Sequence, residues 1–247
     1  MMGWNEIQFT LLAFGSEFLG TLSGFGSSTF FIPLAQIFEN YHLVLVLTSA
    51  LHVFGNFNRI IQFSHKLELK SILFYVVPSM LLSFFGALIN PYLPVFYLQK
   101  IVAVFLIFIS FYQFFFKTVE STKGLASNQW MSFLLISLSG FLTGLIGTGG
   151  ALRGVALVSL GLPQATFIHL SALIDIAGDI LRLGAYIYNG YMDWTHWFYL
   201  PCLAGAAFLG TRLAKKVLQK IPQEKFYKIV SVFIFISALL LLFNKGS

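Results

Sequence analysis

The second half of this chain repeats its first half with a constant shift of 123 residues. In the first half, the clearest repeated positions are Phe18, Leu22, Gly24 and Gly26, which match Phe141, Leu145, Gly147 and Gly149. Further along, Gly55, Arg59 and Pro78 match Gly178, Arg182 and Pro201. Duplication of a hydrophobic half is typical of secondary transporters, whose halves move about a site at their shared interface. The duplication therefore predicts two structural repeats with a functional site between them.

The composition excludes a soluble globular protein. Of the 247 residues, 57% are hydrophobic and only 10% are charged, which leaves too little polar surface for a water-exposed fold. The apolar runs cover residues 6–38, 41–63, 71–90, 97–116, 130–160, 164–189, 195–213 and 226–243. These runs are continuously apolar, which excludes an outer-membrane barrel. We therefore expect an all-α, polytopic membrane protein embedded in a lipid bilayer, with about eight membrane segments.

Three further classes are excluded by local features. The first apolar run lacks a basic leading segment and contains Glu17, so it is not a cleavable signal peptide. Cys202 is the single cysteine, which excludes an internal disulfide and a cysteine-based metal cage. The net charge of +6 comes mostly from lysines beside membrane segments, so we expect no nucleic acid partner.

The only polar stretch in the middle of the chain is residues 117–129. It separates a first transmembrane repeat, residues 1–116, from a second, residues 130–247. No loop is long enough to hold a soluble catalytic domain, so any chemistry must occur within the membrane or at its faces.

Two apolar runs, 6–38 and 130–160, are too long for one straight span and too short for two. Glycines interrupt both runs near the middle: Gly15, Gly20, Gly24 and Gly26 in the first, and Gly140, Gly144, Gly147, Gly149 and Gly150 in the second. We interpret each run as a re-entrant hairpin of two half-helices. Non-helical backbone at membrane depth is tolerated where it is buried or lines a cavity, so the tips would mark the transport path. The alternative is that each run is one kinked helix.

The distribution of positive charge favours the hairpins. Eight simple crossings would divide the loop and membrane-face cations 7 to 5, whereas two hairpins divide them 10 to 2, with Lys100 and Lys245 alone on the far side. Positive-inside bias selects the second division. It places the 117–129 connector in the cytoplasm and both termini outside, and it inverts the second repeat relative to the first.

Three arginines, Arg59, Arg153 and Arg182, lie inside apolar runs. A guanidinium at membrane depth costs at least about 3 kcal/mol, so an ion partner or an aqueous path is expected. Its planar fork of donors suits carboxylate, sulfonate or phosphate oxygens.

Arg59 and Arg182 each close a triad spaced i, i+4, i+7 on one helical face: His52, Asn56 and Arg59, and Asp175, Asp179 and Arg182. Asp179 is placed for an intrahelical ion pair with Arg182, so the second triad fits structural pairing and substrate or proton contact equally. Arg59 has no acidic neighbour at helical spacing. It is therefore the better candidate to meet a mobile anion, the alternative being that it snorkels to the headgroups.

The expected hairpin tips combine glycines with hydroxyls and an arginine. Arg153 follows Gly149 and Gly150 in the first turn of a half-helix, where unpaired N–H groups attract anions. The predicted substrate-binding set is Gly24, Gly26, Ser27, Ser28, Asn56, Arg59, Gly147, Gly149, Gly150, Arg153 and Arg182. An added methyl at Gly26 or Gly149 is then expected to block substrate and leave folding nearly intact. The alternative is that these glycines only permit tight helix packing.

Several buried titratable groups are candidates for proton coupling: Glu17, His52, His169, Asp175 and Asp179. Each could instead only hydrogen-bond a neighbouring helix. We expect no metal, no cofactor and no catalytic residue, because His52, His169 and His196 do not form a spaced ligand set.

Several motifs together resemble a known family. They are the stretch 144–150 (Gly-Leu-Ile-Gly-Thr-Gly-Gly), Gly161-Leu162-Pro163, Ser171-Ala172-Leu173 and Gly190-Tyr191-Met192-Asp193-Trp194. In this order they resemble the second half of the TauE/SafE sulfite-exporter family, and the likeness covers the whole chain through both repeats. The first half departs from the pattern, with Gly26-Ser27-Ser28 in place of a fuller glycine run and Lys66-Leu67-Glu68 in place of the Asp-Trp ending.

The resemblance implies a transporter of small sulfur-containing anions such as sulfite, sulfonates or thiosulfate, usually moved outward across the bacterial inner membrane. Coupling to the proton gradient is expected. A passive anion channel is the first rival and an intramembrane enzyme the second. The sequence leaves a homo-oligomer open.

Overall fold

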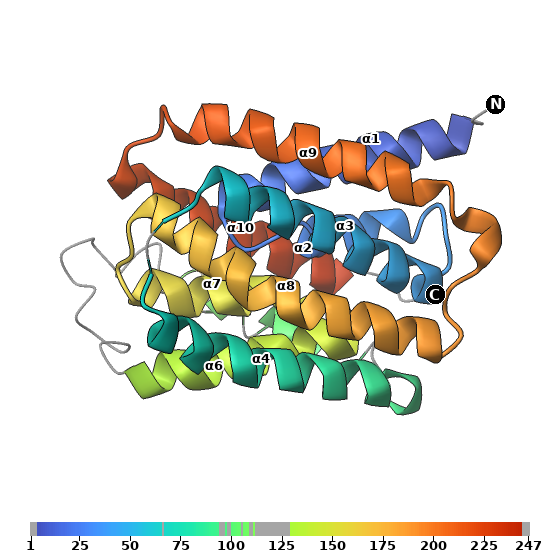
Figure 1. Ribbon diagram of the computed structural model, residues 1–247, viewed down its shortest axis with the longest axis horizontal. Coiled ribbons are helices and arrows are strands. Elements are labelled where there is room, and N and C mark those ends of the chain that lie inside the picture. The colour runs from blue at the N-terminus through green and yellow to red at the C-terminus, as the bar shows by residue number, and fades with distance from the viewer. Residues whose placement is uncertain are drawn as a thin grey trace.

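The computed structural model describes residues 4–65, 67–93, 97, 100–104, 106–108, 111 and 129–243. The connector 117–128 and most of the expected segment 97–116 lie outside these residues, as do Lys66 and Lys245. Throughout the described part every regular element is a helix (Figure 1). The order in the first half is α1 Trp4–Ser23, α2 Ser28–Ala35, α3 Tyr41–Gln62, α4 Leu69–Ile89 and η1 Asn90–Tyr92. The order in the second is α6 Gln129–Ile146, α7 Gly150–Ser159, α8 Gln164–Tyr188, η3 Trp194–His196, α9 Tyr199–Leu218 and α10 Gln223–Phe243.

The run 130–160 folds back on itself. Helix α6 ends at Ile146, and Gly147 has a φ of +82°, which glycine adopts without steric cost. Near the open end of the hairpin, the hydroxyl oxygens of Ser132 on α6 and Ser159 on α7 are 3.5 Å apart. At the closed end, the start of α7 packs against the last turns of α6. The two helices are therefore antiparallel.

The run 6–38 folds in the same way. The chain turns between α1 and α2 at Gly24 and Gly26, whose φ angles are +78° and +103°. Near the open end, the Phe9 ring of α1 meets the Phe31 ring of α2 edge-on, with centroids 5.2 Å apart. Figure 1 shows both pairs of helices lying side by side. Each long run is thus a helical hairpin, and the alternative of a single kinked helix is wrong. The expectation of two half-helices is wrong as well, because each hairpin joins a long helix of 20 or 18 residues to a short one of 8 or 10 residues.

Helices α4 and α6 cross with their backbones in direct contact. A Cβ atom on Gly144 would lie 1.8 Å from the carbonyl oxygen of Ser83, and one on Gly140 would lie 2.3 Å from that of Ser79. From the other side, a Cβ atom on Gly86 would lie 2.3 Å from the carbonyl oxygen of Phe141. Small residues four apart allow such close packing where the surrounding lipid gives no hydrophobic drive for helix association.

Apolar side chains cover the outside of the bundle. Four helices of the described part are long and apolar enough to cross a membrane: Tyr41–Gln62, Leu69–Tyr92, Gln129–Ile146 and Glu224–Phe243. On α4, large apolar side chains recur every fourth residue and are all exposed: Leu69, Leu73, Val77, Leu81 and Phe85. The three arginines of the apolar runs are fully buried instead. This distribution is the inverse of a soluble protein and is typical of a bilayer-embedded bundle.

Most lysines of the described residues lie at one end of the bundle, where α3, α7 and α9 end and α4, α8 and α10 begin (left in Figure 1). They are Lys70, Lys215, Lys216, Lys220, Lys225 and Lys228. We call this the lysine end. Lys100 lies at the opposite end, where it donates a hydrogen bond to the carbonyl oxygen of Leu242 near the end of α10. The described lysines are therefore grouped as the hairpin interpretation predicts.

The Gly190-to-Trp194 ending forms the turn after α8. Gly190 has a φ of +78°, and Asp193 accepts hydrogen bonds from the backbone N–H of Thr195 at 3.0 Å and from its hydroxyl at 2.7 Å. These hydrogen bonds from Thr195 hold the pKa of Asp193 below its usual range. The aspartate thus shapes the turn that leads into η3.

The contact between α4 and α6 generates a stability prediction. Gly144→Ala should lower the free energy of unfolding by about 1–3 kcal/mol, because the new methyl has only backbone to push against. Gly184→Ala, on the exposed side of α8 with nothing within 4 Å, is the matched control and should be neutral or slightly stabilising. Thermal melting in detergent measures both. Equal melting temperatures for the two variants would contradict the close crossing.

Candidate functional site

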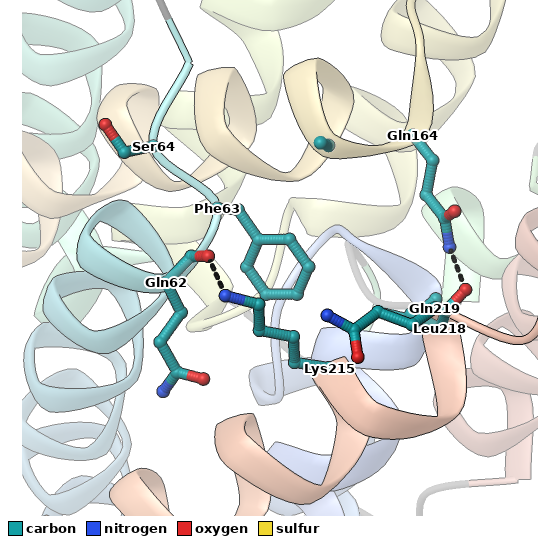
Figure 2. A pocket seen from close by; sticks show the side chains of 8 residues that line it. Gln62, Phe63, Ser64, Gln164, Lys215, Leu218 and Gln219 are labelled. Atoms are coloured by element: carbon teal, nitrogen blue, oxygen red, sulfur yellow. Dashed lines mark hydrogen bonds between the residues drawn. The ribbon is translucent and has the colours of Figure 1, made fainter.

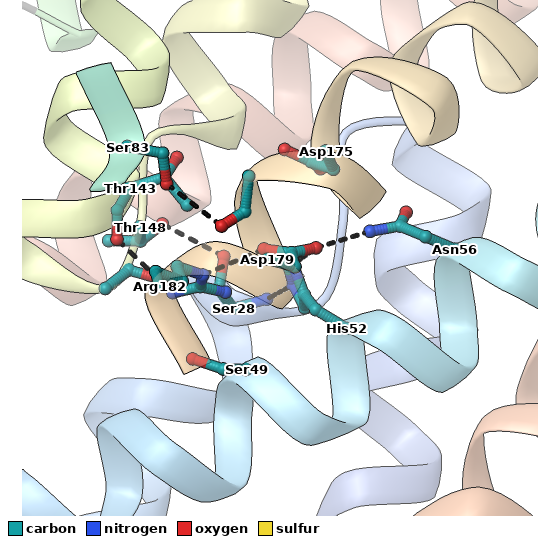
Figure 3. A network of polar contacts seen from close by, with 12 residues as sticks. Ser28, Ser49, His52, Asn56, Ser83, Thr143, Thr148, Asp175, Asp179 and Arg182 are labelled. Atoms are coloured by element: carbon teal, nitrogen blue, oxygen red, sulfur yellow. Dashed lines mark hydrogen bonds and ion pairs between the residues drawn. The ribbon is translucent and has the colours of Figure 1, made fainter. Parts of the chain in front are cut away.

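The site lies where α3 and α8 run antiparallel and the tips of both hairpins reach them (Figure 3). The helices position the polar side chains, and the two interruptions at residues 24–27 and 147–149 bring non-helical backbone beside them. Almost every charged group of the site is less than about a tenth exposed, so each must find a partner inside the protein.

Each buried arginine is paired with its own carboxylate. Arg182 Nε lies 2.8 Å from Asp179 Oδ1, as the three-residue spacing predicts. Arg153 binds Asp175 with both terminal nitrogens of its fork. Arg59 contacts Glu17 Oε1 through Nη2 at 2.8 Å and Nε at 3.1 Å. The three positive charges are therefore balanced by three negative ones.

The pairing of Arg59 corrects one expectation. Arg59 has no acidic neighbour at helical spacing, but the conclusion that it is the better candidate for a mobile anion is wrong in this conformation. Its partner Glu17 comes from α1, 42 residues away, where helical spacing cannot reveal it. Because all three arginines are paired, their charges alone do not select an anionic substrate. The sign of the substrate's charge must therefore be inferred from other groups.

Glu17 and Arg59 tie three helices together. Glu17 Oε1 also accepts hydrogen bonds from the hydroxyls of Thr21 on α1 and Thr211 on α9, both at 3.1 Å. Gly55 leaves room for this carboxylate, since a Cβ atom there would lie 2.5 Å from Oε1. Arg59 Nη1 donates to Asn56 Oδ1 at 2.8 Å and so links the pair to the centre of the site.

The two triads face each other across the seam between α3 and α8. Asn56 Nδ2 donates to Asp179 Oδ2 at 2.7 Å, and His52 Nδ1 lies 3.4 Å from the same oxygen. Residues 56 and 179 are equivalent positions of the duplication, separated by 123 residues. The sequence predicts each triad on one helical face, but not that the two faces meet.

His52 and Asp175, also equivalent positions, each hold the returning helix of their own hairpin. His52 Nε2 accepts a hydrogen bond from the backbone N–H of Ser28, the first residue of α2, at 2.8 Å. Asp175 binds the side chain of Arg153 in the first turn of α7. Arg153 Nη2 reaches further and donates to the carbonyl oxygen of Phe25 in the opposite tip at 2.8 Å.

Hydroxyl groups fill the junction between the tips. Thr148 Oγ1 lies 3.4 Å from Ser28 Oγ and 3.0 Å from Thr29 Oγ1. The Oγ of Ser27 is buried and has no hydrogen-bond partner among the described residues. Thr29 and Thr148 are absent from the predicted site. Their position beside the tip glycines was the available signal, because a side chain next to a hairpin turn faces the same junction.

Arg182 approaches this junction with one donor unused. Its Nη1 donates to the carbonyl oxygens of Thr143 at 3.3 Å and Gly147 at 3.2 Å, next to Thr148. Its Nη2 is buried without a partner within the described part of the chain. A buried, charged N–H group without an acceptor is costly, so this nitrogen marks a place where an acceptor belongs.

The tip glycines are packed against protein, which corrects another expectation. A Cβ atom on Gly149 would lie 2.0 Å from the carbonyl oxygen of Ser139, and one on Gly150 would lie 2.1 Å from that of Phe25. At Gly26, a Cβ atom would lie 2.9 Å from His52 Cε1. The prediction that a methyl at Gly26 or Gly149 leaves folding nearly intact is therefore wrong, because the space serves close packing.

The ligand atoms of His52, Asp175 and Asp179 all lie within 4.8 Å of one another, a spacing that a metal ion could bridge. The charges around them do not suit a cation. Both oxygens of Asp175 are bound by Arg153, and Asp179 is shared by Arg182 and Asn56. We therefore assign no metal to this cluster. His169 lies nearer the lysine end on α8, buried but outside the cluster.

A pocket opens at the lysine end of the α3 and α8 seam (Figure 2). It has a volume of about 220 Å³ and is lined by Gln62, Phe63, Ser64, Gln164, Ala165, Lys215, Leu218 and Gln219. Lys215 donates to the carbonyl oxygen of Gln62 and lies 5.6 Å from the centre of the Phe63 ring. The pocket thus places a positive charge beside the end of α3 and the start of α8.

The pair of Glu17 and Arg59 can be tested by removing one charge and then both. Glu17→Gln should lower the free energy of unfolding by about 3–5 kcal/mol, because it leaves a buried guanidinium uncompensated. The double variant Glu17→Gln, Arg59→Gln should recover much of that loss. Thermal melting of the purified variants checks this. A single variant that melts like wild type would show that the charge is compensated elsewhere.

Comparison with known proteins identifies the family. A family model described as sulfite exporter TauE/SafE matches residues 9–241. None of the curated proteins compared with the chain matches it. The matched residues include both hairpins, both triads and the turn after α8, so the resemblance in the sequence motifs is confirmed. The chain therefore belongs to the TauE/SafE sulfite exporter family and is a multi-pass membrane transporter.

Proposed function

We propose that this protein exports a small sulfur oxyanion, of the sulfite, sulfonate or thiosulfate class, by binding it between the two hairpin tips. Family membership supports the substrate class. The buried Nη2 of Arg182 is the observation that carries the site, because it has no partner among the described residues. Nη1 of the same side chain binds the carbonyl oxygen of Gly147, next in sequence to Thr148, whose hydroxyl meets those of Ser28 and Thr29. Sulfur oxyanions present several strong acceptors, and a guanidinium with hydroxyl donors satisfies them directionally.

The balanced charges of the site suit a transporter that must also return empty. Without substrate, each arginine is neutralised by its carboxylate, so no net charge is stranded at membrane depth. An arriving anion competes with Asp179 or Asp175 for a guanidinium, and a proton taken up within the site can balance the charge of the displaced carboxylate. This exchange supports coupling to the proton gradient. A passive channel has no need for such paired charges.

Reciprocal contacts support two inverted repeats, spanning residues 1–116 and 130–247. A Cβ atom on Gly24 would meet Phe167 and Ile168 of α8, and one on Gly147 would meet Leu45 of α3. Positions 24 and 147 are equivalent in the duplication, as are 45 and 168. Each tip therefore packs against the helix of the other half. A two-fold axis between repeats produces such an exchange, and the contact of Asn56 with Asp179 lies on it.

The grouping of lysines supports an orientation with the lysine end in the cytoplasm. Both termini then lie outside, the hairpins re-enter from their own sides, and the membrane is the bacterial inner membrane. The pocket beside Lys215 would face the cytoplasm and attract an anion toward the seam of α3 and α8.

Flux measurements in proteoliposomes test the function. We expect transport of sulfite, sulfoacetate or thiosulfate in preference to sulfate and acetate, and stimulation by a pH gradient. Arg182→Lys should raise the substrate KM about tenfold or more. A lysine ammonium cannot hydrogen-bond Asp179 and the carbonyl oxygen of Gly147 and still reach the anion. Arg212→Lys, an exposed arginine on α9, is the matched control.

Three results would contradict this assignment. A normal KM in both Arg182→Lys and Thr148→Val, with unchanged melting temperatures, would show that the anion does not bind at the tip junction. Flux without any response to a pH gradient would favour a passive channel. Turnover of a sulfur compound into a new product would favour an intramembrane enzyme.

Cysteine labelling tests the orientation. With Cys202→Ser as background, a cysteine at Lys220 should react with an impermeant thiol reagent only from the cytoplasmic side. A cysteine at Asn189, at the other end of the bundle, should react only from outside. Reversed labelling would overturn the orientation and leave the substrate site untouched.

A further inference from the structure

His52 lies between a hairpin tip and the acidic residues of α8. Its Nε2 accepts the N–H of Ser28 at 2.8 Å, and its Nδ1 faces Asp179 Oδ2 at 3.4 Å. Gly26 packs directly on the ring, so the imidazole also supports the turn before α2. The side chain is 1% exposed, which leaves these protein groups as its surroundings.

The hydrogen bond from Ser28 fixes the tautomer of this histidine. An imidazole nitrogen that accepts a hydrogen bond carries no proton, so neutral His52 has its proton on Nδ1, facing Asp179. A proton on Nε2 would occupy the lone pair that holds Ser28. Protonation and docking of the tip therefore exclude each other, because both need the same lone pair.

Charged groups lie around His52 on several elements. Asp179 and Asp175 face it from α8, where they are paired with Arg182 and with Arg153 of α7. On its own helix, Arg59 is neutralised by Glu17 of α1. The tip contributes no titratable side chain between residues 24 and 28. A protonated His52 would thus face the carboxylates of Asp175 and Asp179 on one side. On the other side it would no longer accept the hydrogen bond from Ser28.

The second hairpin lacks this device. Its equivalent residue, Asp175, grips α7 through the permanently charged side chain of Arg153. A carboxylate accepts hydrogen bonds with either oxygen, so one proton need not release the arginine. The two repeats therefore hold their tips by different chemistry.

We propose that His52 is a proton-operated latch on the first hairpin: the neutral ring docks Ser28, and the protonated ring releases residues 24–31. This proposal rests on the proposed transport function. It places the coupling proton on Nε2 of His52, and it makes α2 and the turn before it the first part of the protein to move. Released backbone N–H groups at the start of α2 then become available at the junction where the anion binds.

His52→Gln separates the hydrogen bond from the titration. The amide oxygen of glutamine can accept the Ser28 N–H near the position of Nε2, but it takes up no proton. Counterflow of labelled substrate should survive in this variant, while stimulation of flux by a pH gradient should be lost. His42→Gln, an exposed histidine on the same helix, is the matched control and should respond to the gradient like wild type.

Amide hydrogen exchange provides a readout that does not require transport. At about pH 5.5, the segment 24–31 should exchange at least about tenfold faster in wild type than in His52→Gln, whereas at about pH 8 the two should agree. The segment 147–154 should show no such difference. Comparison at equal pH removes the intrinsic pH dependence of exchange.

The outcomes separate the latch from the proposed function. Gradient-driven flux in His52→Gln, or equal exchange of 24–31 in both proteins at about pH 5.5, would overturn the latch. If His52→Gln loses counterflow and melts early, His52→Asn provides the second test, because its shorter side chain cannot reach Ser28. The segment 24–31 should then exchange rapidly at every pH. Protection of this segment in His52→Asn would also overturn the latch. Absence of sulfur-anion flux in wild type would contradict the transport function, while hydrogen exchange would still decide the latch.

Discussion

Cancellation of charge in a medium of low dielectric constant is the constraint on which this structure depends. An arginine cannot escape burial by losing its proton, so each of the three must keep a carboxylate within hydrogen-bond reach. The requirement brings particular helices together: Glu17 joins α1 to α3, and Asp175 joins α8 to α7. Charge pairing is thus one condition on helix packing, beside the glycine contacts that join α4 to α6.

The same constraint explains how much could be predicted from sequence. The hairpins and the pair of Asp179 with Arg182 could be predicted from glycine positions and short spacing, and the structure contains both. The partner of Arg59 could not be predicted, because Glu17 lies on another helix and no regular sequence spacing relates residues that touch across two helices. The meeting of Asn56 with Asp179 and the place of Thr148 depend likewise on how the tips dock.

The tips combine two properties that are often opposed. Their glycines remove side chains so that backbone lies on backbone, which favours rigidity. Their hydroxyls and N–H groups form hydrogen bonds that can be exchanged for those of an anion at similar energy. Under the proposed function, the glycine packing would keep a tip ordered while its hydrogen bonds change partners.

Residues 56 and 179 hold matching positions in the duplication and touch each other. In an assembly of two identical halves, this position would face its own copy, so two aspartates would repel and two asparagines would leave the neighbouring cations unbalanced. Joining the halves in one chain removes that restriction. One side can then carry the amide donor and the other the carboxylate acceptor, so a contact that exact symmetry would forbid becomes a hydrogen bond of 2.7 Å between the two halves.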